Sequence, residues 1–222
     1  MAGAAFPRLY PILDVTTLLR ISDGDDVADL VERAAKTFFV AGIEILQLRA
    51  KSSTPQEILA LSEAIKATRD AAGTKCKIIL NDRPDLALLA GFEGCHLGQE
   101  DLSVAGARRM LPRPKILGLS THDAAQIEAA NESDADYIAI GPIFATSTKE
   151  NPDAVIGVDG LARLRASARK PVVAIGGITR ANFRSVVDAG ADSVAVIGNL
   201  LADCTAGNLE SQLTQNIRDF LD

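Results

Sequence analysis

Apolar and polar positions follow two alternating periods along this chain. Short apolar runs rich in β-branched residues, typical of buried strands, are each followed by a longer stretch in which apolar residues recur every three or four positions, as on one face of a helix. Eight runs of the first kind are present. They predict strands at Leu9–Val15, Ile43–Leu48, Lys77–Leu80, Gly94–His96, Ile116–Leu119, Tyr137–Ile140, Val172–Ile175 and Ser193–Ile197.

The longer stretches predict helices between these strands. An alternation of strand and helix repeated eight times, at intervals of roughly 15–35 residues, is what a (β/α)8 TIM barrel requires. An open doubly wound sheet is the alternative, but eight regular strands in 222 residues favour closure. We therefore predict an α/β protein with one TIM-barrel domain over residues 1–222, of which residues 1–7 are an N-terminal extension. Helices are expected at Asp26–Ala41, Pro55–Ala72, Ala105–Leu111, Ala124–Ser133, Asp159–Ala168, Arg180–Ala189 and within Gly207–Leu221.

Composition narrows the class of protein. The chain has 47% hydrophobic and 23% charged residues, as soluble globular proteins do, and three cysteines without a CxxC pair, which argues against a disulfide framework or a cysteine zinc site. No segment approaches the roughly 18 apolar residues of a membrane span, and the N-terminus lacks the features of a secretory signal, so we expect a cytoplasmic protein without membrane association. The net charge of −6 argues against binding to nucleic acid.

The second predicted strand ends in two cations and an amide. In TIM barrels the chemistry lies at the C-terminal ends of the strands. The alternation of an extended chain places Gln47, Arg49 and Lys51 on one side and Leu48 and Ala50 on the other. The alternative is a solvated strand edge with ordinary surface cations, but a strand within a closed barrel has no exposed edge. The two cations therefore indicate a site for an anionic group.

Two aspartates follow the third and fourth predicted strands. Asp82 comes directly after Asn81, and Asp101 closes the segment after the fourth strand. Because neighbouring strands lie about 4.8 Å apart, the two carboxylates can converge on one hard cation. Mg2+ is the natural candidate, since it is held by one or two carboxylates together with substrate phosphate oxygens and waters. Either aspartate alone is more often a helix cap, because a helical stretch follows each of them.

Ser120 offers a hydroxyl at the end of the fifth strand. A serine hydrolase would need a base partner, and the only histidines are His96 and His122. The sequence contains no GxSxG motif, and we expect His122 at the start of the following helix. We therefore assign Ser120 to hydrogen bonding, leave both histidines without a catalytic role, and expect no Ser–His or Cys–His pair that is usable for nucleophilic catalysis.

The loops after the last three strands have the features of a phosphate site. After the sixth strand, the chain breaks at Gly-Pro and presents hydroxyls and an ammonium group, which suit an anionic group, although a solvated surface loop is the alternative. Glycines after the seventh and eighth strands let backbone N–H groups approach a phosphate, although a Gly-Gly pair equally marks a tight turn. The residues concerned are Thr146, Ser147, Thr148, Lys149, Gly176, Gly177 and Gly198.

Six motifs occur at these strand ends: QLRAK at 47–51, NDR at 81–83, HLGQEDL at 96–102, GLSTH at 118–122, GPIFATSTK at 141–149 and AIGGI at 174–178. Together they resemble the thiamine-phosphate synthase family, also called thiamine-phosphate pyrophosphorylase. The resemblance runs from about residue 9 to about residue 200 with every motif in the family's order. It therefore covers nearly the whole chain.

The resemblance implies a transferase that joins 4-amino-2-methyl-5-hydroxymethylpyrimidine diphosphate to 4-methyl-5-(2-phosphoethyl)thiazole, carboxylated or not, giving thiamine phosphate and diphosphate. Because the aminopyrimidine can delocalise a cation, we expect a Mg-assisted dissociative displacement by the thiazole nitrogen, with no protein nucleophile. The family pattern puts Mg2+ on Asp82 and Asp101. It puts the pyrimidine diphosphate on Gln47, Arg49, Lys51, Asn81, Ser120 and Lys149, and the thiazole phosphate on Thr146, Ser147, Thr148, Gly177, Ile197 and Gly198. The catalytic roles fall to Arg49, Lys51, Lys149 and Ser120.

Two positions depart from the family pattern. Gly198 stands where the family usually has serine, and Leu13 where the first strand usually has threonine, so the thiazole site is expected to be weaker or altered. Two other functions stay open: a thiazole tautomerase of the related branch, which would have little need of the cations and metal ligands, and a non-catalytic binder of thiamine precursors. The partners expected are small phosphorylated substrates. The sequence does not fix the oligomeric state, so a homo-oligomer also stays open.

Overall fold

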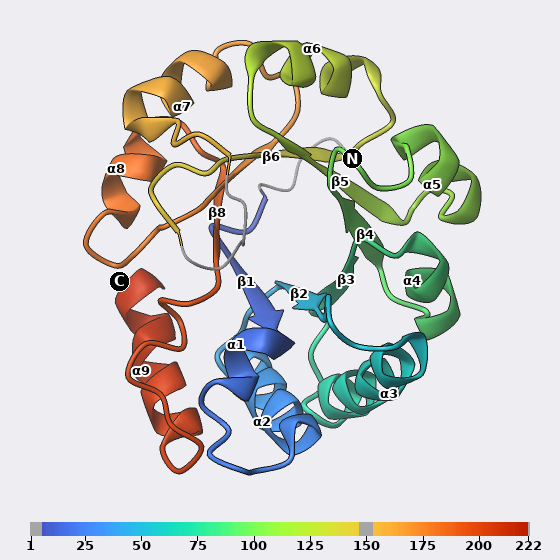
Figure 1. Ribbon diagram of the computed structural model, residues 1–222, viewed down its shortest axis with the longest axis vertical. Helices are drawn as coiled ribbons and strands as arrows, with labels where there is room; N and C mark the ends of the chain where they lie inside the picture. Colours follow the sequence, from blue (N-terminus) through green and yellow to red (C-terminus); the bar gives the residue numbers. More distant parts are fainter. Residues whose placement is uncertain (1–5, 147–152, 222) are drawn as a thin grey trace.

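The computed structural model describes residues 6–146 and 153–221. Within them, parallel strands form a closed barrel in which each strand pairs with its sequence neighbours and β8 pairs with β1 (Figure 1). The predicted TIM barrel is therefore confirmed. The strands are β1 Leu9–Asp14, β2 Ile45–Arg49, β3 Lys77–Asn81, β4 Gly94–Leu97, β5 Ile116–Thr121, β6 Tyr137–Ile140, β7 Val172–Ile175 and β8 Ser193–Val196.

Helices form a ring around the barrel (Figure 1). The last helix, α9, packs beside α2, where Nε of Arg33 donates to Glu210 at 2.6 Å and so joins the two ends of the ring. None of the helices in the described ranges is long and apolar enough to cross a membrane. The helices are α1 Val15–Leu19, α2 Val27–Val40, α3 Pro55–Ala71, α4 Pro84–Ala90, α5 Val104–Met110, α6 Ala124–Glu132, α7 Gly157–Arg165, α8 Phe183–Asp188 and α9 Leu209–Leu221.

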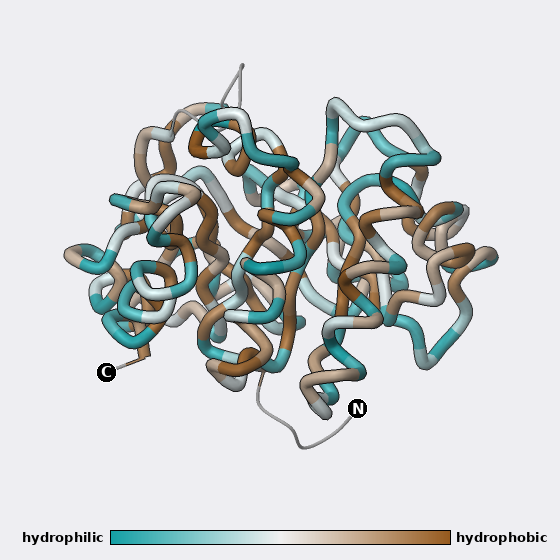
Figure 2. Tube along the Cα trace, turned by 90° about the horizontal axis from the view of Figure 1, so that it is seen from below, coloured by the Kyte–Doolittle hydropathy of each residue, from teal (hydrophilic) through white to brown (hydrophobic). Residues whose placement is uncertain are grey.

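Side chains of the strands divide between two cores. In β2, Ile45 belongs to a cluster inside the barrel, whereas Leu46 and Leu48 belong to a larger cluster between the barrel and the helices. This alternation confirms that Leu48 and Ala50 face away from the barrel interior, since both lie in the outer cluster. Figure 2 shows hydrophilic positions gathered on the outer turns around the hydrophobic strands. The inner cluster consists of Tyr10, Ile12, Ile45, Ile79, Ile116, Tyr137, Ala139, Val173 and Ala195.

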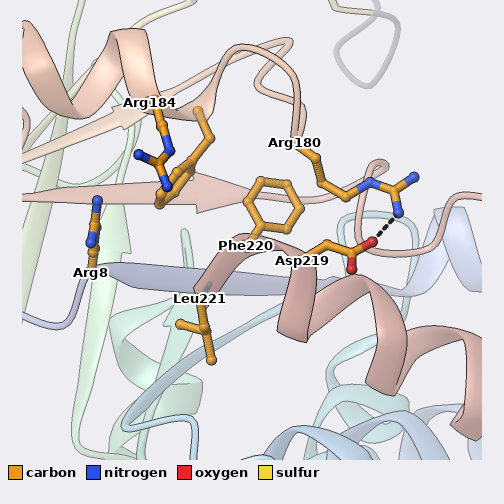
Figure 3. A pocket seen from close by; sticks show the side chains of 7 residues that line it. Arg8, Arg180, Arg184, Asp219, Phe220 and Leu221 are labelled. Atoms are coloured by element: carbon orange, nitrogen blue, oxygen red, sulfur yellow. Dashed lines mark hydrogen bonds and ion pairs between the residues drawn. The ribbon is translucent and has the colours of Figure 1, made fainter.

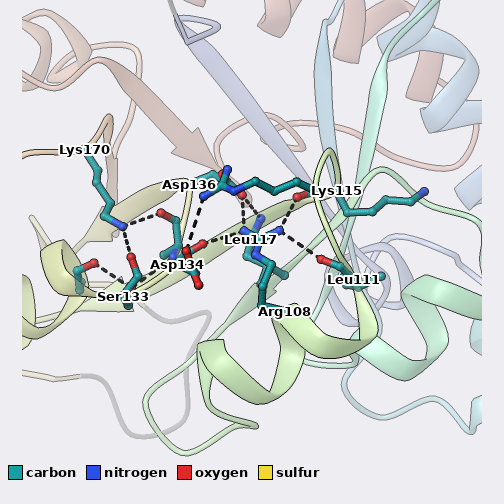
Figure 4. A network of polar contacts seen from close by, with 11 residues as sticks. Arg108, Leu111, Lys115, Leu117, Ser133, Asp134, Asp136 and Lys170 are labelled. Atoms are coloured by element: carbon teal, nitrogen blue, oxygen red, sulfur yellow. Dashed lines mark hydrogen bonds and ion pairs between the residues drawn. The ribbon is translucent and has the colours of Figure 1, made fainter. Parts of the chain in front are cut away.

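Three acidic residues join neighbouring strands at the N-terminal end of the barrel. Asp136, which precedes β6, accepts a hydrogen bond of 2.8 Å from the Leu117 N–H of β5 and one of 2.7 Å from Arg108 of α5 (Figure 4). This end lies opposite the C-terminal ends, where barrel chemistry occurs, so these contacts serve stability. The corresponding sets are Glu93 with Ile78 and Arg69, and Asp192 with Val172 and Arg165.

Three differences from the predicted elements affect the candidate site. Helix α1 was not predicted, because five residues are too few to show a helical period. Its N-cap is Asp14, whose carboxylate accepts a hydrogen bond from the Thr17 N–H. Strand β5 extends to Thr121, so Ser120 lies within a strand rather than in the loop after it. Helix α8 begins at Phe183 instead of residue 180, because the Thr179 N–H first bonds the side chain of Asn182 in a turn.

Candidate active site

An ion pair lies at the C-terminal ends of β1 and β2. Asp14 and Arg49 occupy matched register positions, and Oδ1 of Asp14 lies 2.5 Å from Nη1 of Arg49. Arg49 is largely buried and Asp14 is almost completely so. Asp14 lies within the first strand predicted from the sequence, and sequence reasoning gave it no role. The signal available was that Asp14 lies at the C-terminal end of a strand, where the other predicted site residues also lie.

Three charged groups gather at the ends of β3 and β4. The ammonium group of Lys51 lies 3.2 Å from Oδ2 of Asp82. Burial raises the pKa of Asp82, the negative charge of Asp101 raises it further, and the Lys51 ammonium acts in the opposite direction. Asp101 itself accepts a hydrogen bond of 2.6 Å from the Gly98 N–H. The two predicted metal ligands are therefore close enough for their charges to interact.

The helix-cap alternative for the two aspartates is wrong. Helix α4 has Arg83 at its N-cap without a side-chain hydrogen bond, and α5 is capped by Ser103, whose hydroxyl accepts from Gly106. Asp82 also adopts a left-handed φ of 64°, which a non-glycine residue rarely does. Neither carboxylate is thus used to start a helix, and both remain at the barrel mouth.

The donor set fits a magnesium ion held jointly with a substrate. The described residues contain no group of three or more His, Cys, Asp or Glu side chains placed to hold a metal. The charge of Asp101 makes it harder to ionise Asp82, and a neighbouring pair of carboxylates matches the protein share of a typical magnesium site, in which phosphate oxygens and waters supply the other ligands.

Ser120 and His96 form a hydrogen-bonded pair at the ends of β4 and β5. Oγ of Ser120 lies 2.9 Å from Nε2 of His96, whose Nδ1 lies 2.9 Å from the Tyr137 hydroxyl. Burial lowers the pKa of His96 to about 4, so the neutral imidazole is too weak a base to activate serine near neutral pH. The assignment of Ser120 to hydrogen bonding thus stays a prediction compatible with the geometry. The pair was missed because the two residues meet only across the β4–β5 pairing.

Gln47 lies two residues before Arg49 on β2, and its side chain points to the same side of the strand. It is 2% exposed, and its Nε2 donates to the Tyr10 hydroxyl at 3.2 Å. Asn81, the last residue of β3, is half-buried at the same end of the barrel as Asp82. Gln47 and Arg49 therefore lie on the inner side of β2, as the period-two alternation predicts, and Asn81 ends the neighbouring strand.

The loops after β6 and β7 are bound to each other. The Ile143 N–H donates to Ile175 O and the Phe144 N–H to Gly176 O, both at 2.9 Å. Gly177 has φ of 61°, and a β-carbon there would lie 2.3 Å from Ala145 O, so only glycine fits. This holds Gly177 beside the segment that leads to Thr146. Ser147, Thr148 and Lys149 lie outside the described residues.

The two departures from the family pattern have different surroundings. A β-carbon added to Gly198, in the loop after Ile197, meets no atom within 4 Å. Leu13 is 1% exposed and packs in the outer cluster under the helices. Leu13 therefore faces the helices rather than the barrel mouth, and an effect of this position on the thiazole site stays a prediction.

A separate cavity of about 160 Å³ lies outside the barrel (Figure 3). Arg180 and Asp219 form an ion pair of 2.6 Å on its wall. None of the predicted site residues lines it, so it is not the candidate active site. Its lining residues are Arg8, Arg180, Phe183, Arg184, Asp219, Phe220 and Leu221.

A family model described as thiamine monophosphate synthase matches residues 9–200 of the chain. The chain belongs to this family. It is 46% identical to the thiamine-phosphate synthase of Koribacter versatilis over 91% of this chain and 92% of the relative. It is 38% identical to that of Chloroflexus aurantiacus, over 90% and 88%. The structure of a thiamine phosphate pyrophosphorylase from Pyrococcus furiosus superposes with a TM-score of 0.75 at 26% identity, covering 97% of both chains.

Membership in the thiamine monophosphate synthase family confirms the resemblance read from the six motifs. It also confirms the enzyme class, since the curated relatives are synthases of the transferase type. The match to the Koribacter versatilis synthase covers almost the whole length of both chains, so it is not limited to the residues at the barrel mouth.

Proposed function

We propose that the protein joins hydroxymethylpyrimidine diphosphate to thiazole phosphate and releases diphosphate. Family membership supports the reaction class. The observation that carries the choice of substrates is the fixing of two cations, Arg49 and Lys51, by the carboxylates of Asp14 and Asp82 at the mouth of the barrel. Because Arg49 is largely buried and held by Asp14, it can receive a diphosphate without first being ordered.

Arg49 and Lys51 stabilise the leaving group in this proposal. Asp14 engages Nη1 of Arg49, which leaves the other guanidinium donors for diphosphate oxygens. Lys51 is 54% exposed, so its ammonium can turn from Asp82 to the substrate. Lys149, which lies outside the described residues, is proposed as a third cation from its sequence position. These charges oppose the negative charge that develops as the C–O bond breaks.

Asp82 and Asp101 are proposed to hold magnesium together with the diphosphate. A bound magnesium ion supplies positive charge to the diphosphate oxygens. The two carboxylates supply oxygen ligands, and Lys51 keeps Asp82 partly neutralised between turnovers.

The bond-forming step needs no nucleophile from the protein. When the C–O bond breaks, the aminopyrimidine delocalises the positive charge on its methylene carbon, and the thiazole nitrogen donates its electron pair to that carbon. Gln47, Asn81 and Ser120 are proposed to hold the pyrimidine ring in place. Gln47 is buried, so we place it beneath the ring rather than at its edge. Diphosphate leaves with the electron pair of the broken bond, so charge and atoms balance.

The loops after β6, β7 and β8 are proposed to bind the thiazole phosphate. The glycine conformation at Gly177 and the open surface at Gly198 let backbone N–H groups approach phosphate oxygens. The proposed contacts are Thr146, Gly177, Ile197 and Gly198, with Ser147 and Thr148 added from the sequence alone.

The release of diphosphate tests the proposal. Purified protein is mixed with hydroxymethylpyrimidine diphosphate, thiazole phosphate and magnesium, and each is omitted in turn. We expect release only when all three are present. Failure of a folded protein that still binds one precursor to release diphosphate would overturn the synthase in favour of the tautomerase or the non-catalytic binder.

A matched pair of arginine variants gives the test a control. Arg49→Ala should lower kcat roughly a hundredfold, because a charge aimed at the leaving group is lost. Arg69→Ala removes an arginine of equal exposure, 15%, from the opposite end of the barrel. It should leave the kinetics unchanged.

A further inference from the structure

Five side chains form a continuous chain of hydrogen bonds across the barrel interior. Gln47 donates to the Tyr10 hydroxyl at 3.2 Å, and the hydroxyls of Tyr10 and Tyr137 lie 3.1 Å apart. The Tyr137 hydroxyl lies 2.9 Å from Nδ1 of His96, and Nε2 of His96 lies 2.9 Å from Oγ of Ser120. These five residues are named the interior chain. Four of them are buried, and Ser120 is partly exposed at the mouth.

Gly118 makes room for the interior chain. A β-carbon at this position would lie 2.1 Å from Cζ and 2.3 Å from Oη of Tyr137, and 2.5 Å from Nδ1 of His96. Any side chain at position 118 would therefore displace the contact between Tyr137 and His96.

Both tyrosines of the interior chain keep their hydroxyl protons. Burial raises the pKa of Tyr10 and of Tyr137. Each hydroxyl therefore has one proton to donate and an oxygen that can accept. In the imidazole, a nitrogen that carries a proton donates and one without a proton accepts.

The amide of Gln47 sets the direction of the hydrogen bonds, because each buried hydroxyl proton needs an acceptor. An amide nitrogen donates and does not accept, so the proton of Tyr10 goes to the Tyr137 oxygen. The proton of Tyr137 then goes to Nδ1 of His96, which leaves the imidazole proton on Nε2. His96 donates that proton to Ser120, so the hydroxyl proton of Ser120 is directed to another partner.

We propose that the interior chain makes Ser120 a hydrogen-bond donor toward the barrel mouth, so that Ser120 selects an acceptor atom of the substrate, namely a ring nitrogen of the pyrimidine rather than its amino group. Tyr137 and His96 are positioning residues, because they act through Ser120. The identity of the substrate rests on the proposed function, whereas the direction of the chain does not.

The tautomer of His96 tests the direction without turnover. The protein has two histidines, so nitrogen-15 spectra of the histidine-labelled enzyme contain two imidazoles, and the His122→Asn variant assigns them. We expect His96 in the Nε2–H form. The Nδ1–H form would overturn the proposal, because Ser120 would then donate to His96 and present an acceptor to the mouth.

Tyr137→Phe tests the effect on the substrate. This variant keeps the ring but removes the donor to His96, so we expect both tautomers of His96 and a fall of about tenfold in kcat/KM for hydroxymethylpyrimidine diphosphate. The KM for thiazole phosphate should not change. Thr121→Val is the control, because it removes another buried hydroxyl of β5, one that donates to Ala139 O and lies outside the interior chain. It should change neither the tautomer nor the kinetics.

The outcomes separate the two proposals. A mixture of tautomers in Tyr137→Phe with unchanged kcat/KM would overturn the role of Ser120 in selecting the substrate. An Nε2–H imidazole in a wild-type enzyme that releases no diphosphate would overturn the proposed function alone, since the tautomer is read on the free protein.

Discussion

The carboxylate of Asp14 contacts the guanidinium of Arg49 through one oxygen and helix α1 through the other. Oδ1 accepts from Arg49 at 2.5 Å, while Oδ2 accepts from the backbone N–H of Thr17 at 3.0 Å and from its hydroxyl at 2.7 Å. Since Asp14 is 1% exposed, its charge depends on these partners rather than on water. One buried carboxylate thus orients a proposed substrate cation and begins a helix.

Asp14→Asn should lower kcat/KM for hydroxymethylpyrimidine diphosphate by about tenfold to a hundredfold. The amide can still cap α1, but it no longer holds Arg49 by a charge-assisted hydrogen bond. Steady-state kinetics measure the effect. Asp26→Asn changes the cap of α2, where the carboxylate accepts from the Ala28 N–H at 2.9 Å, and should leave kcat/KM unaltered. Wild-type kinetics in Asp14→Asn would show that Arg49 is placed without this ion pair.

Asp101→Asn should raise the magnesium concentration needed for half-maximal activity by roughly tenfold or more. The substitution removes one proposed ligand and also the negative charge that raises the pKa of Asp82. Initial rates over a magnesium titration measure the change. Asp85→Asn serves as the control, because Asp85 pairs with Arg83 at 2.6 Å at the start of α4. A magnesium requirement equal to that of the wild type would remove Asp101 from the proposed metal site.

Gly198→Ser should lower the KM for thiazole phosphate several-fold. The space beside Gly198 is open, so a hydroxyl can be added there without displacing an atom, and one more hydrogen bond to phosphate is worth about 1 kcal/mol. Kinetics with thiazole phosphate as the varied substrate give the result. A raised KM would mean that the phosphate binds elsewhere.

Leu13→Thr, at the other position that departs from the family pattern, should act on stability alone. Leu13 is buried in the outer cluster, so the substitution should lower the free energy of unfolding by about 3 kcal/mol and leave the KM for thiazole phosphate unchanged. Denaturant unfolding measures the first quantity. An altered KM at wild-type stability would contradict the placement of Leu13.

His96 should make the free energy of unfolding depend on pH. Burial lowers the pKa of His96 to about 4 in the folded protein, from the ordinary 6.5 of an exposed imidazole. Between these values the unfolded chain binds a proton that the folded protein does not, so stability is full above pH 6.5 and falls as the pH drops toward 4. From pH 6.5 to 5 the loss should be about 2 kcal/mol. Denaturant unfolding of the wild type and of His96→Gln measures it. Equal pH dependence in the two proteins would contradict the burial effect.

The barrel could be predicted from the sequence because its signals are local. Period-two and helical patterns are visible within each segment, and most element ends fell within three residues of the prediction. The site residues at strand ends could also be located, since Arg49 and Asp82 follow apolar runs directly. Their grouping follows from closure, which brings all C-terminal ends to one face.

The contacts within the site could not be predicted in the same way. The pairing of Asp14 with Arg49 depends on strand register, and the contact of Tyr137 with His96 depends on depth within the barrel. Gly118 gave no sequence signal, because a glycine in a strand is read as a bulge or a weak position. The space that it leaves can be recognised only once the neighbouring rings are placed.

The three acidic residues at the N-terminal end of the barrel have a consequence for how the chain folds. Each reaches a strand only 15, 19 or 20 residues earlier, whereas Arg33 and Glu210 are 177 residues apart. Short loops lose little entropy on closing, so neighbouring units can assemble in chain order. The contacts of β8 with β1 and of α9 with α2 can form only when both ends of the chain are in place. We therefore expect neighbouring units to close first during folding, and the contacts between the first and last elements to form last.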